Sequence, residues 1–85
     1  MDAQQSFAAT EMSIAYTMLW SACLKHGVRQ QNALRRAEQA YQGAAKFANG
    51  AEELRQPLVE LKAEIDNWSA DKCDHYRKKS LDWHS

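Results

Sequence analysis

The sequence predicts a small all-α protein built as a bundle of three helices. Apolar residues recur every three to four positions through most of the 85-residue chain, which is the period of an amphipathic helix. Two glycines, Gly27 and Gly50, divide this pattern into three segments, and no stretch shows the alternation of a strand. A chain of this length forms one domain, so residues 1–85 are expected to share a single core.

The first helix is expected over about residues 3–25 and has apolar residues on two opposite sides. Between Ala3 and Leu24 the only charged residue is Glu11. At roughly 100° per residue, one apolar stripe contains Ala9, Met12, Tyr16, Leu19 and Cys23, and the other contains Phe7, Ile14 and Met18. A helix that is apolar on both sides has to be covered on both sides. Because so short a chain has little left to cover both, we expect a second molecule on one of the stripes.

The second helix is expected over about residues 28–48, between the two glycines. Its broad apolar face consists mostly of alanine and contains Ala33, Leu34, Ala37, Ala40, Tyr41, Ala44, Ala45, Phe47 and Ala48. Small side chains allow another helix to approach closely, so this face is expected to pack tightly against a neighbour.

The third helix is expected to begin at Ala51 or at Pro57 and to continue to about residue 83. Proline is tolerated in the first turn of a helix but not in its interior, so a short turn followed by a kink at Pro57 satisfies both starts. One line along this helix contains Leu54, Leu58, Leu61, Ile65 and Trp68, and continues through Lys72, Tyr76, Lys79 and Trp83. The apolar pattern weakens toward the end, where Trp83 either meets a partner or folds back on the bundle.

Charge is balanced over the whole chain, which has eleven basic and eleven acidic residues. Such neutrality argues against general adhesion to nucleic acid or to anionic membranes. The middle segment, residues 25–50, is nevertheless basic and lies between two acidic segments. Its arginines are expected to pair with the acidic face of the third helix, and the carboxylates of that face, including Glu60 and Glu64, are expected to be solvated.

No segment has the features of a membrane span or of an export signal. The apolar stretch from Met12 to Leu24 is shorter than the roughly 20 residues that cross a bilayer, and the N-terminal residues lack positive charge. Cys23 and Cys73 are too few for a disulfide framework, so free thiols in a reducing compartment are expected. These observations predict a cytoplasmic protein that does not bind membranes.

Cys23 with His26, and Cys73 with His75, are the residues whose types suit a metal ion. If the first and third helices run parallel, the two pairs lie at similar height, so a zinc site and a disulfide both remain alternatives. Side chains two residues apart diverge on a helix, however, so Cys73 and His75 point apart unless the helix has ended. We therefore expect no metal site and no cofactor.

An enzyme is not expected. Ser69, Asp74 and His75 are residue types of a catalytic triad, but they crowd into a polar segment with no enclosing pocket in prospect. The glycines are dispersed along the chain, so they form no phosphate-binding loop.

These patterns favour a small helical protein-binding module, such as an adaptor, a secretion-type chaperone or an inhibitor of a larger protein. Its apolar first helix is expected to bind the protein partner and to form a homodimer or a heterodimer. The expected contact residues are Phe7, Glu11, Ile14, Met18, Trp20 and Trp83. Flexible and aromatic side chains of this kind often dominate association energies.

Two alternatives to a protein-binding module stay open. A nucleic-acid-binding protein would use the basic middle helix, through Arg29, Arg35, Arg36 and Lys46. A small metal-binding helical domain would use the two Cys/His pairs described above. Nucleic-acid binding is disfavoured by the zero net charge.

Overall fold

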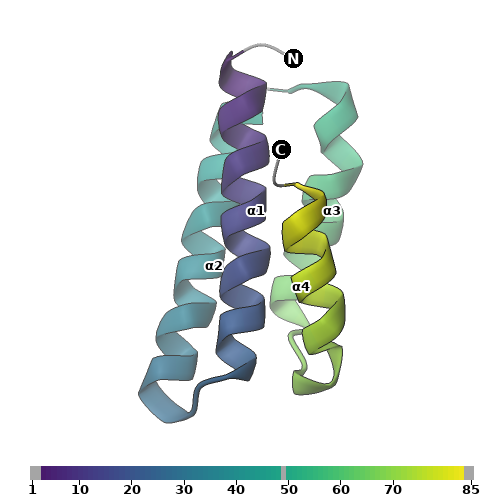
Figure 1. Ribbon diagram of the computed structural model, residues 1–85. Helices are drawn as coiled ribbons and strands as arrows, with labels where there is room; N and C mark the ends of the chain where they lie inside the picture. The colour runs from purple at the N-terminus through teal and green to yellow at the C-terminus, as the bar shows by residue number, and fades with distance from the viewer. Residues whose placement is uncertain (1–2, 49, 84–85) are drawn as a thin grey trace.

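The computed structural model describes residues 3–48 and 50–83, with side chains from Ser6 onward, and it contains only helices and turns in this range. The helical elements are α1 (Ala3–Cys23), α2 (Gly27–Ala48), α3 (Glu52–Asp66), the 3-10 turn η1 (Ala70–Lys72) and α4 (Cys73–Asp82). Successive α-helices run in opposite directions along the long axis of the molecule (Figure 1). The all-α prediction is confirmed, but the expected third helix is two antiparallel helices.

The predicted third helix is wrong in its second half because the chain reverses direction at Asn67. The backbone N–H and the side-chain Nδ2 of Asn67 both donate to the carbonyl of Ala63, at 3.0 and 2.8 Å. Ser69 then caps the next turn, where its hydroxyl accepts a hydrogen bond of 3.2 Å from the N–H of Asp71. Asparagine and serine side chains compete with helical hydrogen bonds, so these residues end α3 and start the turn into α4.

The two predicted glycine breaks are confirmed, whereas the position of the proline differs from the expectation. Gly27 and Gly50 have φ angles of +59° and +78°, which side chains with a Cβ atom rarely adopt. Helix α3 begins at Glu52, so Pro57 lies inside it rather than in its first turn. The N–H that Pro57 lacks would have bonded to the carbonyl of Glu53, which is in an exposed residue.

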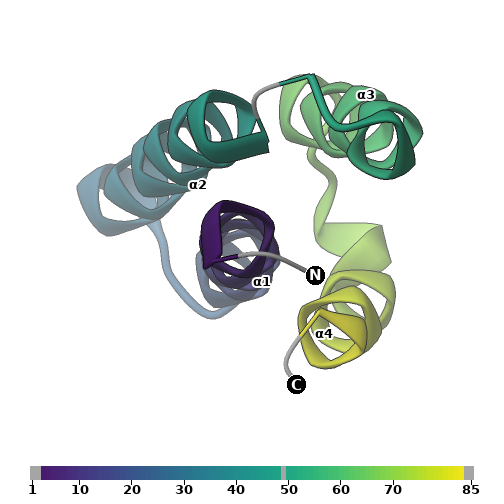
Figure 2. The same cartoon turned by 90° about the horizontal axis from the view of Figure 1, so that it is seen from above.

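Helix α1 lies in the middle of the arrangement, with α2, α3 and α4 around it (Figure 2). Met12, Tyr16 and Leu19 are fully buried in the core, so this is the stripe of α1 that faces its own chain. Leu54 and Leu61 of α3 belong to the same core. These contacts cover one of the two apolar stripes that the sequence predicts.

A third buried line on α1 was not predicted. Ala8, Ala15 and Ala22 are seven residues apart, lie on one face of the helix and are completely buried. On α2 the buried residues are Ala33, Ala37, Ala40, Ala44 and Ala48, which confirms the expected close packing of its alanine face. Ala45 and Phe47, also expected there, are exposed. The chain therefore covers more of α1 than expected, although one side of α1 stays open.

Cys23 and Cys73 form a disulfide, so the expectation of two free thiols is wrong. The bond joins the last residue of α1 to the first residue of α4, whose Cα atoms are 6.1 Å apart. The reversal at Asn67 places the start of α4 beside the end of α1. Of the two alternatives that the sequence leaves open for these cysteines, the structure contains the disulfide. Disulfides persist in oxidising compartments, so the cytoplasmic prediction loses the observation that supported it.

Among the described residues, no helix is both long enough and apolar enough to cross a lipid bilayer.

Candidate functional site

One side of α1 carries apolar side chains that the chain itself leaves on the surface. Phe7 is 59% exposed and Ile14 is 42% exposed, while Met18 is partly buried. Together with Glu11 these residues follow one another at intervals of four, three and four, so they form a single line along α1. The second predicted stripe therefore lies on the surface, beside the edge of α2.

Helix α2 supplies the opposite wall. Its residues on this side alternate between intervals of three and four as far as Gly43 and end four residues later at Phe47; they are Arg29, Asn32, Arg36, Gln39, Gly43 and Phe47. The two walls meet at one end through Phe7 and Phe47, whose ring centroids are 5.7 Å apart. Both walls thus repeat with the seven-residue period that is typical of packed helices.

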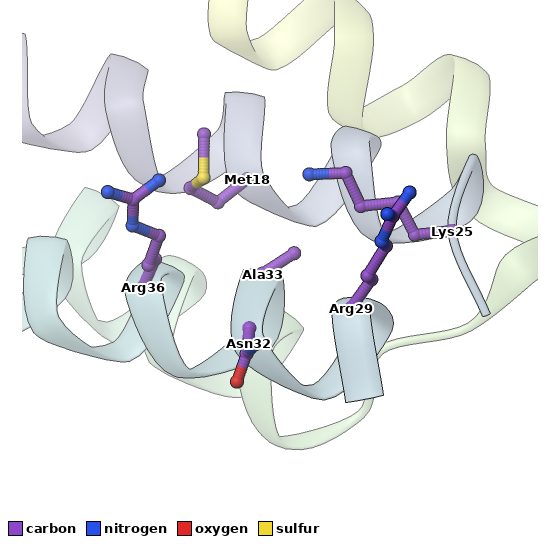
Figure 3. A pocket seen from close by; sticks show the side chains of 6 residues that line it. All are labelled: Met18, Lys25, Arg29, Asn32, Ala33 and Arg36. Carbon is purple, nitrogen blue, oxygen red and sulfur yellow. The ribbon is translucent and has the colours of Figure 1, made fainter. Parts of the chain in front are cut away.

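Between these walls lies a continuous groove, called here the α1/α2 groove. One section, of about 510 Å³, is lined by Met18, Lys25, Arg29, Asn32, Ala33 and Arg36 (Figure 3). The adjoining section, of about 370 Å³, is lined by Glu11, Ile14, Met18, Arg36, Gln39 and Ala40. Because Met18 and Arg36 line both sections, the groove is continuous from one to the other.

The groove is basic. Lys25, Arg29 and Arg36 line it, against a single acidic residue, Glu11. Within the described part of the chain, none of these four residues forms an ion pair. The groove therefore presents positive charge that the protein itself does not neutralise.

The expected pairing of the α2 arginines with acidic residues of α3 is wrong. The contact between α2 and α3 uses Glu38 instead, which binds the ammonium group of Lys62 at 3.1 Å. Lys62 also binds Asp66 at 3.3 Å, and these hydrogen bonds, with Glu38 as the main cause, raise its pKa. Glu38 follows Arg36 by two residues and lies about 200° from it around the helix. Arg36 therefore points away from α3.

Gly43 allows the carboxylate of Glu11 to lie against α2. A Cβ atom at Gly43 would lie 3.2 Å from Oε2 and 3.4 Å from Cδ of Glu11. These distances are tighter than an ordinary van der Waals contact, so any larger residue at this position would displace the Glu11 side chain. The small residue thus leaves room for the acidic group of the groove.

Two of the predicted contact residues lie outside the groove. Ser13 of α1 donates a hydrogen bond of 2.9 Å to the carbonyl of Ser80 in α4. Trp20 follows Ser13 by seven residues and so lies on the same, α4-facing side of α1. Trp83 is partly buried and packs against the core, as Trp20 does. The structure therefore brings Phe7, Glu11, Ile14 and Met18 together and separates both tryptophans from them.

Two of the four basic residues proposed for nucleic acid line the groove. Arg29 and Arg36 are seven residues apart and share the groove side of α2. Arg35 and Lys46 are exposed, but neither lines the groove. Arg35 lies about 100° around the helix from Arg36.

A second polar cluster joins α1, α3 and α4 through Glu64. Its Oε2 accepts a hydrogen bond of 2.7 Å from the hydroxyl of Tyr16, and its Oε1 contacts Nε2 of His75. The side chain of Glu64 is only 17% exposed, which contradicts its expected place on a solvated surface. Burial, and then the hydrogen bond to Glu64, raise the pKa of Tyr16 well above its ordinary value. Both carboxylate oxygens are thus engaged in holding three helices together.

The structure also reports on the residues considered for metal binding. No group of three histidine, cysteine or acidic side chains converges on a common point among residues 3–48 and 50–83. The two sulfur atoms are bonded to each other, and His75 is engaged with Glu64. His26 is exposed in the turn before α2.

A scan against protein-family models, a search of curated proteins and a search of solved structures each find no match to this chain. The function is therefore argued from the groove itself.

Sequence reasoning missed the contribution of α2 to this site. The sequence pattern places Phe47 on the core-facing side of α2, and it suggests only ion pairs or nucleic-acid contacts for Arg29 and Arg36. The available signal was the alternation of intervals of three and four from Arg29 to Gly43, which matches the alternation on α1.

Proposed function

We propose that this protein is a small protein-binding module that accepts a helix of its partner in the α1/α2 groove. The observation that supports the proposal is the line of Phe7, Ile14 and Met18, which stays on the surface and borders the groove. Exposed apolar residues that form a continuous patch are typical of binding surfaces. A partner that covered this patch would complete the burial of α1.

The shape of the groove supports a helix as the bound element. Its walls are two antiparallel helices whose lining residues repeat every seven positions (Figure 1). Side chains of a third helix fit between such rows in the manner of a helical bundle. The groove side of α1 extends from Phe7 to the end of the helix at Cys23, which corresponds to about 24 Å of helix. A bound helix of about 17 residues would follow its whole length.

An adaptor, an inhibitor or a secretion-type chaperone would each act through such a surface. All three functions require the protein to occupy a segment of a larger partner, and none requires a catalytic group. The helices that form the groove are packed through buried alanines, and α1 is tied to α4 by the disulfide. A rigid, preformed groove reduces the entropy lost on binding.

Site-specific photo-cross-linking tests this proposal. Ile14 is replaced by p-benzoylphenylalanine, and Val59 of α3, which is 57% exposed, is replaced in the same way as the matched control. Irradiation of the cells that naturally make the protein is expected to join position 14, but not position 59, to one partner protein. The same products from both positions, or no protein product from position 14, would contradict the proposal.

The variant Ile14→Asp provides the second readout. Ile14 is substantially exposed, so the change is expected to leave the thermal midpoint within a few degrees of the unmodified protein and to remove binding. Val59→Asp is the matched control and is expected to keep both the thermal midpoint and the binding of the partner. Ile14 is better suited to this test than Met18, because Met18 packs against the core. Unfolding of Ile14→Asp would show that this face is part of the core.

A further inference from the structure

We infer that the partner helix is acidic and amphipathic, with carboxylates opposite Lys25, Arg29 and Arg36 and apolar residues opposite Ile14 and Met18. This inference rests on the proposed function and specifies the chemistry of the ligand. It follows from the arrangement of charge and apolar surface within the α1/α2 groove.

The basic groups stand at two points along the groove, and an apolar section lies between them. Figure 3 shows Arg36 on one side of Met18, with Arg29 and Lys25 on the other side, beyond Ala33. Guanidinium groups bind carboxylates through paired hydrogen bonds, which fix orientation as well as charge. A helix that places glutamate or aspartate before and after an apolar section therefore matches this part of the groove.

The spacing of the arginines predicts the spacing of the partner's acidic residues. Arg29 and Arg36 are seven residues apart on α2, which corresponds to about 10.5 Å along the helix axis. A partner helix that runs along the groove would place its carboxylates at the same interval, two turns apart. Beyond Arg36 the groove leads to Glu11 and to the Phe7–Phe47 pair, so that end of the partner is expected to be apolar.

A second copy of this protein does not suit the groove. Two copies that met through this face would bring together six basic groups and only the two carboxylates of Glu11, because each groove carries three basic residues and one acidic residue. Like charges facing each other across an interface oppose association. The expected self-association is therefore replaced by binding to a different, acidic chain.

The floor of the groove distinguishes an acidic helix from a nucleic acid. Phosphate groups would bind the arginines but would leave the apolar surface of Ile14 and Met18 without a complement. An amphipathic helix satisfies both parts of the groove at once. The lining residues therefore favour an acidic helix over a nucleic acid.

The test uses a pair of helical peptides, each about three heptads long, with the same leucine stripe. One carries glutamate beside the stripe and the other carries lysine at the same positions. Fluorescence anisotropy measures their affinity for the intact, oxidised protein. We expect the glutamate peptide to bind at least about tenfold more tightly, and its affinity to fall when salt is raised from about 0.05 to about 0.5 M.

A charge-reversal variant assigns the preference to the groove. With Arg29→Glu/Arg36→Glu, the lysine peptide is expected to bind more tightly than the glutamate peptide. The control variant Arg55→Glu/Arg77→Glu changes the net charge by the same amount at exposed positions of α3 and α4. It is expected to bind the glutamate peptide more tightly than the lysine peptide, as the unmodified protein does. An equal loss of affinity for the glutamate peptide in both double variants would show that only net charge matters and would overturn the inference.

The possible failures can be told apart. If the two peptides bind equally and Ile14→Asp abolishes both, the groove binds helices without selecting charge, and this inference alone is wrong. If neither binds at up to about 1 mM, the proposed function is wrong as well. A homodimer that Ile14→Asp dissociates, or a single-stranded oligonucleotide that binds more tightly than the glutamate peptide, would also overturn the inference.

Discussion

Removal of the disulfide is expected to cost this protein a large part of its stability without changing its fold. The change is Cys23→Ala/Cys73→Ala, which replaces two partly buried sulfur atoms by small apolar groups. In the folded state α4 keeps its other contacts, which include the fully buried Tyr76 and the 2.9 Å hydrogen bond from Ser13 to Ser80. The folded protein is therefore expected to lose stability mainly because the unfolded chain, without the cross-link, gains conformational entropy.

The size of the effect follows from the length of the loop that the disulfide closes. The two cysteines are 50 positions apart in the sequence. Loop-closure entropy gives about 3 kcal/mol for a loop of about 15 residues and about 4.7 kcal/mol for one of about 100 residues. The corresponding value for this loop is about 4 kcal/mol. A domain of this size has a total stability of about 5–15 kcal/mol, so the double variant is expected to be folded but weakened.

Urea unfolding followed by circular dichroism measures the loss. With a slope of about 1 kcal/mol per molar, the midpoint of the double variant is expected to lie about 3–4 M below that of the oxidised protein. The unmodified protein treated with reductant serves as the control and is expected to behave like the double variant. Two titratable thiols in the unfolded, non-reduced protein, or coincident midpoints, would refute the reasoning.

Three further predictions concern the core and the groove. Tyr16→Phe removes the hydrogen bond to Glu64 and is expected to lower the free energy of unfolding by about 1–2 kcal/mol in urea, whereas an unchanged value would show that the bond is not formed. Burial raises the pKa of Tyr16 and of Tyr76, so stability is expected to be complete below the ordinary tyrosine pKa of about 10. Above that pH the unfolded chain ionises first, and the free energy of unfolding measured in urea is expected to fall by up to about 1.4 kcal/mol per pH unit for each tyrosine. A free energy that does not change with pH would contradict this prediction. Gly43→Ala is expected to raise the thermal stability by about 0.5–1 kcal/mol because only the flexible carboxylate of Glu11 has to move, and a decrease would show that Glu11 is held in place.

The parts of the fold that depend on local residue pattern could be predicted from the sequence. Gly27 and Gly50 mark helix breaks because positive φ angles are costly for other residues. The stripe of Met12, Tyr16 and Leu19 faces the core because its period matches that of a helix. These signals act within one element and need no knowledge of the neighbours.

The reversal at Asn67 and the disulfide could not be derived in the same way. The hydrophobic line continues from α3 to Tyr76 and therefore predicts one continuous helix. Asn67 and Ser69 end the helix between them through side-chain hydrogen bonds, which the hydrophobic pattern does not show. On a continuing helix Cys73 and His75 point apart, and the sequence alone leaves free thiols, a zinc site and a disulfide as alternatives. The pairing of distant cysteines depends on this tertiary arrangement.

One wall of the candidate groove follows from the sequence pattern. The sequence predicts partner contacts along the stripe of Phe7, Ile14 and Met18, and the structure leaves Phe7 and Ile14 exposed and Met18 partly buried. The basic wall was not foreseen, because the sequence does not show whether Arg36 faces α3 or the open side of α1. That choice depends on which residue of α2 meets α3, and the structure assigns this contact to Glu38.

Nuclear magnetic resonance of the oxidised, ¹⁵N-labelled protein tests the central claim most directly. On titration with the glutamate peptide, the amide signals of Ile14, Met18 and Arg36 are expected to shift together with a common dissociation constant. Shifts confined to α3 and α4, for example around Val59 and Leu81, or no shifts at all, would contradict the assignment of the α1/α2 groove as the docking surface.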